Sequence, residues 1–424
     1  MPRTLAADIM EDVIIRKIPF DTSFSKRLKV RNLSKRDRAF CFNLVLTTLR
    51  RGGQIDDLID TCLERPLGTK GERAMILLRL GVTQIIFMGI KPYAAVDTSV
   101  RLAERRKLGH YKKLINAILR KLAKEGLAVA ETQDAEKLNT PAWLWKSWEK
   151  VYGATTCYNM AKVHQTQPPL DITVKKDPED WATKLSGTNI FGNTVRLNQS
   201  QSVESLPGYS EGDWWVQDLA ATIPVMLFGD VRNSNVADFC AAPGGKTAQL
   251  LSRGAKVTAI ESSHMRVSLL QQNMKRLKLE PKFVVEDACN WQPKKPLDAV
   301  LIDAPCSSTG TLRRNPDIFY TKTKKDVEKL TGIQLALIKA AKNIVKTGGL
   351  IVFSTCSLLP QEGADLIESV LLEDKALSRA PISAEEFGLI PDIVTEIGDL
   401  RTLPFHYSNL GGMDGFYAVR LIRN

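Results

Sequence analysis

The sequence predicts a multidomain chain with three parts: an all-helical N-terminal bundle over residues 1–126, a small α+β module over residues 127–230, and a C-terminal α/β domain over residues 231–424. Two observations carry this prediction. Leucine, isoleucine and valine recur every three or four residues in the first part, as they do along one face of a helix. After residue 235, strand patterns alternate with helical patterns, which is typical of a doubly wound parallel sheet.

The N-terminal part has helical spacing in four segments, which are separated by glycines and a proline: residues 41–49, 73–90, 95–108 and 112–124. The most apolar run, residues 75–90, contains Arg79 and Gln84 and is too short to span a bilayer. We therefore expect a buried helix there, and no membrane partner. The first residues lack the apolar centre of a signal peptide, so we expect a cytoplasmic protein.

The chain of 424 residues has a net charge of +12, and the excess lies in one part of it. Residues 1–126 hold 26 Lys/Arg and 13 Asp/Glu, whereas the remainder holds 33 and 34. Basic residues cluster at residues 26–38 and 101–124. A localised basic domain on a near-neutral body favours a polyanionic partner, first of all nucleic acid. The alternative is a solvated basic face with no partner.

The middle part indicates a short helix at residues 141–148 and a strand at residues 170–175. The helix carries three tryptophans, which we interpret as core residues rather than as base-stacking platforms. The C-terminal part then predicts buried parallel strands at residues 236–241, 256–261, 283–287, 299–304 and 350–355, and a late strand at 415–423. Because open parallel sheets bind ligands at the carboxyl ends of their strands, the residues that follow each strand are candidate site residues.

The first of these strands runs into a turn of small residues that lets a backbone approach a ligand closely. The turn consists of Cys240, Ala241, Ala242, Pro243, Gly244, Gly245 and Lys246. Neither a Walker A loop nor a dinucleotide fingerprint fits it, because the required glycines are absent. The second predicted strand ends at Glu261 and the third at Asp287. Acids at successive strand ends fit an adenosine-containing cofactor, with Glu261 on the ribose hydroxyls and Asp287 at the adenine edge.

Seven cysteines occur singly along the chain, with only four histidines, so we expect neither a zinc site nor a disulfide framework. Two of them stand out. The fourth predicted strand ends at Asp303 and Ala304 and is followed by Cys306, and the fifth runs directly into Cys356. If these strands are neighbours, both thiols overhang the same crevice as the cofactor. The remaining cysteines outside the turn are interpreted as small buried residues: Cys41, Cys62, Cys157 and Cys289.

Two thiols suit methylation at carbon-5 of a cytosine. A thiolate that adds to carbon-6 converts the ring into an enamine, and carbon-5 then becomes nucleophilic. Asp303 can protonate ring nitrogen-3 and so assist the addition. The positive charge of Lys246 can activate a thiol whose ordinary pKa is about 8.5. Arg313 and Arg314 can hold phosphates or shape the pocket.

Long, ordered motifs resemble the RNA cytosine-C5 methyltransferase family over roughly residues 200–424. They lie at residues 216–218, 238–247, 303–317 and 354–362. Residues 94–103 and 113–121 are similar to the NusB-like helical RNA-binding domain. The resemblance implies a NusB-like bundle ahead of a Rossmann-like, S-adenosylmethionine-dependent methyltransferase domain. This pairing is typical of bacterial small-subunit ribosomal RNA methyltransferases and implies a 16S-type ribosomal RNA substrate.

The resemblance also assigns roles within the candidate site. It implies that Cys356 is the nucleophile and that Cys306 assists product release, whereas spacing alone leaves open which thiol attacks. We expect Lys246 and Asp303 to act in catalysis and also to lie beside the cofactor. Glu261 departs from the family pattern, in which aspartate is usual. Two alternatives stay open, namely the same reaction on transfer RNA or another ribosomal site, and a non-catalytic RNA-binding assembly factor. We expect a monomer, because no symmetric apolar interface is apparent.

Overall fold

The computed structural model describes residues 2–30, 33–198 and 202–424, so Arg31 of the first basic cluster lies outside the described residues. The chain forms two compact units. Unit 1 extends to Gln167 and also includes Leu312–Lys322; unit 2 comprises Pro168–Thr311 and Thr323–Asn424. The sequence predicted three domains instead, with boundaries after residues 126 and 230. The division differs because the helical part of the middle region belongs with unit 1 and its strands belong with unit 2.

Unit 1 is helical, as predicted. Its helices are α1 (Pro2–Ile14), α2 (Phe20–Leu28), α3 (Lys35–Arg50), α4 (Gly52–Asp60), α5 (Glu72–Val82), α6 (Pro92–Arg105), α7 (Lys112–Thr132), α8 (Ala135–Leu138), α9 (Ala142–His164) and α14 (Ile318–Thr321). Helix α9 extends beyond the short helix expected at residues 141–148, and its backbone is kinked at Gly153, which has a φ of 78°. Its residues Trp145 and Trp148 are buried, which agrees with the interpretation of the tryptophans as core residues.

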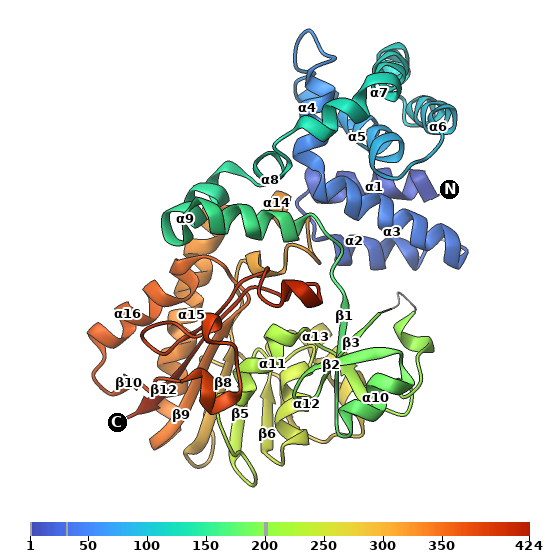
Figure 1. Ribbon diagram of the computed structural model, residues 1–424. Coiled ribbons are helices and arrows are strands. Elements are labelled where there is room, and N and C mark those ends of the chain that lie inside the picture. The colour runs from blue at the N-terminus through green and yellow to red at the C-terminus, as the bar shows by residue number, and fades with distance from the viewer. Residues whose placement is uncertain (1, 31–32, 199–201) are drawn as a thin grey trace. The chain divides into compact units, whose positions relative to one another are not determined.

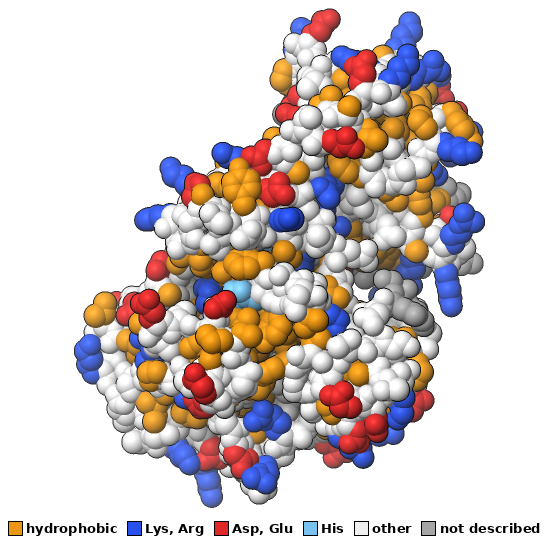
Figure 2. Space-filling model, viewed as in Figure 1, with side chains coloured by type: hydrophobic (Ala, Val, Ile, Leu, Met, Phe, Trp, Pro, Cys, Tyr) orange, Lys and Arg blue, Asp and Glu red, His pale blue; other side chains and the backbone are white. Residues whose placement is uncertain are grey.

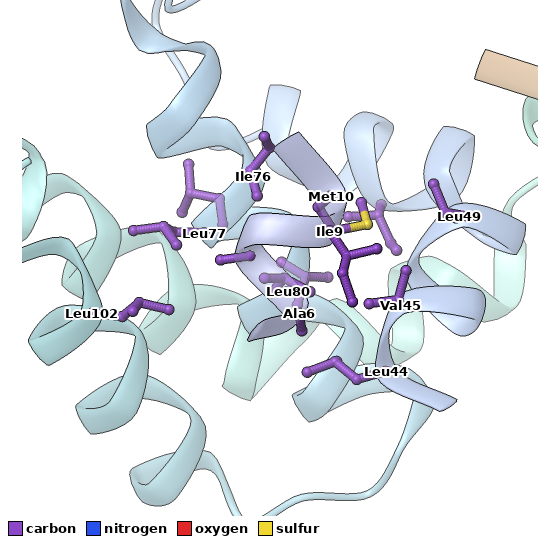
Figure 3. Close-up of a cluster of buried hydrophobic side chains, with 14 of the residues drawn as sticks. Ala6, Ile9, Met10, Leu44, Val45, Leu49, Ile76, Leu77, Leu80 and Leu102 are labelled. Atoms are coloured by element: carbon purple, nitrogen blue, oxygen red, sulfur yellow. The ribbon is translucent and has the colours of Figure 1, made fainter. Parts of the chain in front are cut away.

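The core of unit 1 is made by apolar residues three or four positions apart on several helices, which meet as Figure 3 shows. Helix α1 contributes Ile9 and Met10, helix α3 contributes Leu44 and helix α5 contributes Leu80, all at most 3% exposed. Helical spacing in the sequence therefore translates directly into one buried face per helix. None of the helices in the described part of the chain is long and apolar enough to cross a membrane.

A segment that follows the fourth parallel strand is built into unit 1. Tyr320 Oη donates a hydrogen bond to Leu49 O at 3.0 Å, and Phe20 N donates to Asp317 Oδ2 at 3.0 Å. A Cβ on Gly52 would lie only 1.7 Å from the Tyr320 hydroxyl, so the glycine is what leaves room for that ring. The segment Leu312–Lys322 is thus part of the packing of the helical unit rather than a free loop.

Unit 2 contains two sheets. The first is antiparallel, in the order β2 (Gly187–Phe191), β3 (Thr194–Leu197), β1 (Leu170–Val174), β4 (Trp214–Val216). The second has the path β10 (Leu377–Arg379), β12 (Phe416–Arg423), β9 (Val345–Thr355), β8 (Leu297–Asp303), β5 (Asn235–Phe239), β6 (Lys256–Ile260), β7 (Lys282–Val284), and β11 (Leu400–Thr402) also pairs with β12. The strands from β9 to β7 are parallel, as predicted, and several lie side by side in Figure 1.

Both faces of the parallel sheet are covered by helices, because neighbouring residues of each strand point to opposite sides. Ala237 and Phe239 of β5 pack in one apolar cluster with Leu337 of α15 (Lys324–Ile344) and Ile367 of α16 (Ala364–Glu373). Val236 of the same strand packs in another cluster with residues of α11 (Leu219–Met226) and α12 (Gly245–Ser252). Helix α13 (His264–Leu277) joins α12 in a further cluster. The predicted doubly wound architecture is confirmed.

Candidate active site

The turn after β5 leaves no room for a side chain at its centre. Gly244 has a φ of 108°, which L-amino acids rarely adopt. A Cβ at this position would lie 2.6 Å from Leu270 Cδ1 and 2.8 Å from Met274 Cε, both on α13. The glycine therefore satisfies both the backbone conformation and the close approach of the turn to the helix.

Helix α13 also fixes the carbonyl groups of this turn. Arg266 donates a hydrogen bond to Ala242 O at 2.5 Å, and Asn273 Nδ2 donates to Pro243 O at 2.8 Å. The peptide bond between Ala242 and Pro243 is cis. The predicted cofactor turn is thus a fixed backbone feature at the carboxyl end of β5, and Arg266 and Asn273 are supporting residues that sequence reasoning did not find.

Asp238 of β5 is a buried acid whose place in the site was not predicted. It is 0% exposed, and its Oδ2 accepts a hydrogen bond from Thr247 Oγ1 at 2.5 Å. Its Oδ1 has no hydrogen-bond partner among the described residues. Burial raises the pKa of Asp238 to about 7. An acid inside an otherwise apolar strand was the signal that could have singled it out.

Glu261 directly follows β6, as predicted, and is only 3% exposed. Its Oε1 accepts a hydrogen bond from Ser263 N at 3.2 Å. Its Oε2 lies 3.3 Å from Arg266 Nη1, yet within the described residues it accepts no hydrogen bond. Because buried carboxylate oxygens are normally satisfied, this oxygen is available to a hydroxyl donor of a ligand.

The prediction that the third strand ends at Asp287 is wrong, because β7 ends at Val284. Asp287 lies exposed in the following turn, where its Oδ1 accepts a hydrogen bond from Cys289 N at 2.9 Å. Its main-chain oxygen accepts bonds from Asn290 and Trp291. Acids favour such turns because their side chains can bond the backbone two residues on, and a short strand followed by such a turn resembles a longer strand in sequence.

The two predicted thiols come together. Strands β8 and β9 are neighbours, with Asp303 paired to Ser354, so the loops that follow them lie at the same edge of the sheet. Cys306 Sγ and Cys356 Sγ are 3.4 Å apart. Cys306 is buried, whereas Cys356 is partly exposed. The condition on which the sequence argument depended, that the fourth and fifth strands are adjacent, is confirmed.

These two thiols have opposite acidities. The hydrogen bond from Cys306 lowers the pKa of Cys356, and the charge of Lys246 contributes to that lowering. The same bond to Cys356, together with burial, raises the pKa of Cys306. Burial also raises the pKa of Cys240, to about 12. Cys356 is therefore the thiol at this site that is most readily ionised, and Cys306 is its hydrogen-bond donor.

The remaining two predicted catalytic residues form an ion pair. Lys246 Nζ lies 2.8 Å from Asp303 Oδ2. The lysine side chain is 8% exposed and the aspartate side chain 34% exposed, so the pair has one buried and one accessible partner. The ammonium group also lies 4.9 Å from the centre of the Phe416 ring. Lys246 is thus held at the amino end of α12 with its charge directed to the end of β8.

A cavity of 420 Å³ adjoins this ion pair. Its lining combines the antiparallel sheet with the cofactor turn: Tyr209, Trp215, Gln217, Gly244, Gly245, Lys246 and Asp303 are among the residues that border it. Its volume is in the range of small-molecule sites, which is about 300–1,000 Å³. The residues of the middle region after Pro168 therefore help to build the site.

The sequence suggested that Arg313 holds phosphates or shapes the pocket, but its side chain lies in the interior. Arg313 is 0% exposed and belongs to the segment packed in unit 1. Its main-chain oxygen accepts a hydrogen bond from Arg50, and its charge adds to the effect of burial, which lowers the pKa of His164 to about 3. Arg314 is half-buried. Arg313 therefore packs inside unit 1, although its place in the sequence motif suggested a binding residue.

The fold and the site together define a methyltransferase domain joined to a NusB-type helical domain. Residues 225–422 match the model of the family described as 16S rRNA methyltransferase RsmB/F, and residues 1–124 match the NusB family. The ribosomal RNA small subunit methyltransferase B of Cronobacter sakazakii is 30% identical over 443 residues, which cover 99% of this chain and 98% of that protein. The protein of the same name in Pseudomonas putida is 31% identical over 448 residues, and the match covers 100% of this chain and 98% of that protein. The chain belongs to the RsmB/F methyltransferase family.

The fold agrees with solved structures. The crystal structure of PH0851 has a TM-score of 0.79 and 20% identity, and the match covers 100% of this chain and 99% of that one. S-adenosylmethionine is the methyl donor of this family, so the predicted cofactor is confirmed. The site fits this group, since Glu261 offers a buried, free carboxylate oxygen and Gly244 keeps the adjoining turn close to α13.

Proposed function

We propose that this protein methylates carbon-5 of a cytosine in small-subunit ribosomal RNA through a covalent bond between Cys356 and the base. The observation that carries the proposal is the pair of thiols 3.4 Å apart beside the Lys246–Asp303 ion pair. Among common methyl acceptors, carbon-5 of a pyrimidine is the one whose chemistry calls for a thiolate partner. The relatives that match the whole chain are named as small subunit ribosomal RNA methyltransferases, which supports the substrate.

The reaction begins when the Cys356 thiolate gives an electron pair to carbon-6. The electrons of the carbon-5–carbon-6 double bond then move toward the ring nitrogen, and nitrogen-3 takes up a proton. The ion pair changes the expected role of Asp303, because Lys246 Nζ already lies 2.8 Å from its Oδ2 atom. Asp303 instead accepts a hydrogen bond from the 4-amino group, and the proton for nitrogen-3 comes from Lys246 Nζ through Asp303 Oδ2.

S-adenosylmethionine, when bound, supplies an electrophilic methyl group to carbon-5. The carbon-5 proton then leaves to solvent, its bonding electrons restore the ring double bond, the bond between carbon-6 and Cys356 breaks, and the nitrogen-3 proton returns to Lys246 through Asp303. The sulfur of Cys356 departs as a thiolate. The Cys306 sulfur lies 3.4 Å from that sulfur, so its thiol can donate a hydrogen bond to the thiolate and stabilise the leaving group.

The cofactor is assigned to the turn from Cys240 to Gly245, with Glu261 accepting hydrogen bonds from the ribose hydroxyls. The free Oε2 atom of Glu261 supports this assignment. Asp287 is kept as the partner of the adenine edge, since an exposed carboxylate two or three residues beyond β7 can accept a bond from an amino group. The helical unit 1 is proposed to bind RNA, and a cytoplasmic location and a monomeric state remain predictions.

The proposal is tested by transfer of a radiolabelled methyl group to protein-free small-subunit ribosomal RNA, with transfer RNA as the parallel substrate. We expect label in 5-methylcytosine at a single position of the ribosomal RNA. Label on transfer RNA alone would keep the chemistry and overturn the substrate. Label at a position other than carbon-5 would overturn the mechanism.

A second variant tests the covalent step directly. Cys306→Ala removes the donor to the leaving sulfur, so attack proceeds and release slows. A protein–RNA adduct should then survive denaturing electrophoresis, and it should be absent from the Cys306→Ala/Cys356→Ala double variant. A folded Cys306→Ala variant without adduct would exclude Cys306 from product release.

A further inference from the structure

A buried carboxylate joins the two loops that carry the thiols. Glu362 is 0% exposed and ends the short 3₁₀ helix Pro360–Glu362 that follows β9. Its Oε1 accepts hydrogen bonds from Ser307 N at 2.8 Å and from Gln334 Nε2 at 3.2 Å. Its Oε2 accepts hydrogen bonds from the hydroxyls of Ser307 and Ser357, the latter at 2.7 Å. One side chain thus binds the residue that directly follows each of the two thiols.

Other bonds make the junction of these loops tight. Gly310 N donates to Cys356 O at 2.9 Å, and Leu358 N donates to Thr309 Oγ1 at 3.0 Å. Thr355 Oγ1 donates to the main-chain oxygen of Glu362 at 2.9 Å. The first two bonds join the loop after β8 to the loop after β9, and the Glu362 side chain adds a bridge between Ser307 and Ser357, so a change at Glu362 affects both loops.

The charge of Glu362 is not neutralised by a partner of opposite sign. Within the described residues, every hydrogen bond that its carboxylate accepts comes from a hydroxyl, an amide or a backbone N–H. Such bonds satisfy a buried carboxylate without placing a positive charge beside it. The carboxylate binds the residue next to Cys306, and its charge, after the bond to Cys356 and burial, is one of the causes that raise the pKa of Cys306.

The charged groups around the two thiols are arranged unequally. Asp303 at the end of β8 and Lys246 on α12 act on Cys356, and they form the ion pair already described. Glu362 acts on Cys306 from the other side. Arg401 of β11 donates a hydrogen bond to Ser357 O at 2.6 Å, so its charge lies beside the Cys356 loop. Cys356 thus has one cation and one carboxylate near it, the Lys246–Asp303 pair, whereas the carboxylate that bridges the loops acts on Cys306.

We propose that Glu362 is a positioning residue that holds the two thiols together and gives them different protonation states. It keeps Cys306 protonated while Cys356 ionises. The consequence for catalysis rests on the proposed function, but the protonation states do not. The pKa of Cys306 is raised by the bond to Cys356, by burial and by the Glu362 carboxylate, in agreement with this geometry. A protonated Cys306 can donate to the attacking and leaving sulfur, which an ionised Cys306 would repel.

The experiment uses the full chain with Glu362→Gln and Glu362→Ala. Glutamine can still bond Ser307 and Ser357, because their hydroxyl groups can rotate to accept hydrogen bonds from its amide group. Glu362→Gln therefore removes the charge and keeps the bridge between the loops, whereas Glu362→Ala removes both. Each thiol is titrated by the pH dependence of its alkylation with iodoacetamide, resolved by mass spectrometry of the peptides. The pH midpoint is compared rather than the rate, because limited access slows the reaction equally at every pH.

In the unchanged protein we expect the Cys306 midpoint to lie well above that of Cys356. In Glu362→Gln the Cys306 midpoint should fall by about one pH unit or more, since a neighbouring charge shifts a pKa by about one to three units. Glu373→Gln, an exposed acid at the end of α16, is the matched control and should leave both midpoints unchanged. An unchanged Cys306 midpoint in a folded Glu362→Gln variant overturns the proposal.

Two further results keep the idea testable if a variant does not fold. A Cys306 midpoint at or below that of Cys356 in the unchanged protein would also overturn it, and that measurement needs no substitution. Alkylation needs neither RNA nor cofactor, so failure of methyl transfer in the unchanged protein would count against the proposed function alone. Where methyl transfer is seen, Glu362→Gln should lower the rate of product release more than the rate of adduct formation.

Discussion

Two groups of buried acids, one in each unit, have opposite fates. In unit 1, α1 carries Asp8, Glu11 and Asp12, and each of them meets an arginine. Arg106 donates to Asp8 at 2.5 Å and also to Glu11, and Arg27 binds Asp12 through two bonds of 2.6 and 2.8 Å. The negative charges of these acids neutralise part of the excess positive charge of the N-terminal region. Figure 2 shows acidic side chains interspersed with the basic ones on the visible surface.

In unit 2, three acids around the site are satisfied less completely by basic side chains, although Glu261 Oε2 lies 3.3 Å from Arg266 Nη1. Asp238 is bound by a threonine hydroxyl, Glu362 by uncharged groups, and Glu261 keeps an oxygen without a hydrogen bond within the described residues. The difference appears in the acidities. Burial by itself would raise the pKa of Asp12, but hydrogen bonds from Arg27 and a serine lower it to about 2, whereas burial raises that of Asp238 to about 7.

The contrast teaches that burial of an acid does not define its role; the charge of its partners does. An acid saturated by arginine stabilises the fold and has no capacity left for a ligand. An acid satisfied by neutral groups, or partly unsatisfied, keeps a field or a free acceptor that a ligand or a neighbouring thiol can use. Substitutions at the two kinds of acid should therefore separate stability from activity.

The largest effect is expected from Cys356→Ala, which removes the nucleophile without touching either group of acids. Methyl transfer should fall by at least about 1,000-fold, because loss of a covalent nucleophile removes the main route. Affinity for S-adenosylmethionine, measured by calorimetry, and the melting temperature should stay close to those of the unchanged protein. Turnover near the original level would show that Cys356 is not the nucleophile.

The next largest effect is expected on stability. Asp12→Ala should lower the free energy of unfolding by about 3 kcal/mol, because Arg27 loses both of its bonds to that carboxylate in a partly buried place. Cofactor affinity should not change. The control is Asp97→Ala, which removes an exposed ion pair with Arg101 and should matter by less than about 0.5 kcal/mol in urea unfolding. Equal losses in both variants would show that the buried cluster has no special role.

Glu261→Gln should have the reverse profile. Cofactor affinity is expected to drop about 10-fold, since a charged acceptor becomes a neutral one, while the unfolding free energy changes little. Glu261→Asp should restore part of the affinity, because aspartate is usual at this position in the family. Glu280→Gln, an exposed acid beyond α13, is the control. Full affinity in Glu261→Gln would remove this residue from the cofactor site.

The two kinds of acid should also give opposite pH dependences of stability. Asp12 has a folded pKa below its ordinary 3.8, so its contribution is complete above that value and is lost as the pH falls toward 2. Asp238 has a folded pKa of about 7, so the folded state loses stability as the pH rises from 3.8 to 7. Asp238→Asn should abolish the second slope in urea unfolding followed against pH; a slope that persists would assign it to other groups.

The smallest effect is expected on RNA binding, from exposed basic residues of unit 1 that are not neutralised by acids. Lys26 and Lys29 are exposed, unlike the paired Arg27 between them. In the full chain, Lys26→Ala and Lys29→Ala should each lower the salt dependence of RNA affinity by less than about one unit of slope. Arg101→Ala serves as the comparison at the second basic cluster. An affinity that does not depend on salt would mean that the basic surface binds no RNA.

Much of the catalytic unit could be predicted from local patterns. The strand that precedes Cys356 and the strand that precedes Cys306 each end where the hydrophobic run ends, and the small residues around Gly244 mark the turn. Asp287 was misplaced, because a three-residue strand followed by a polar turn has nearly the same pattern as a longer strand. Glu362 was visible as part of a motif, but its bond to Ser307 joins residues that are 55 positions apart in sequence.

The sequence by itself determined the helical nature of unit 1, the parallel sheet and the residues at its carboxyl edge, because hydrophobic periodicity and turn chemistry act over a few neighbouring residues. The tertiary structure alone decided which thiol ionises, which acids are neutralised by arginine, and where Leu312–Lys322 packs. Each of these depends on side chains brought together from distant segments. Their burial, hydrogen bonds and fields follow from distances that no local pattern encodes.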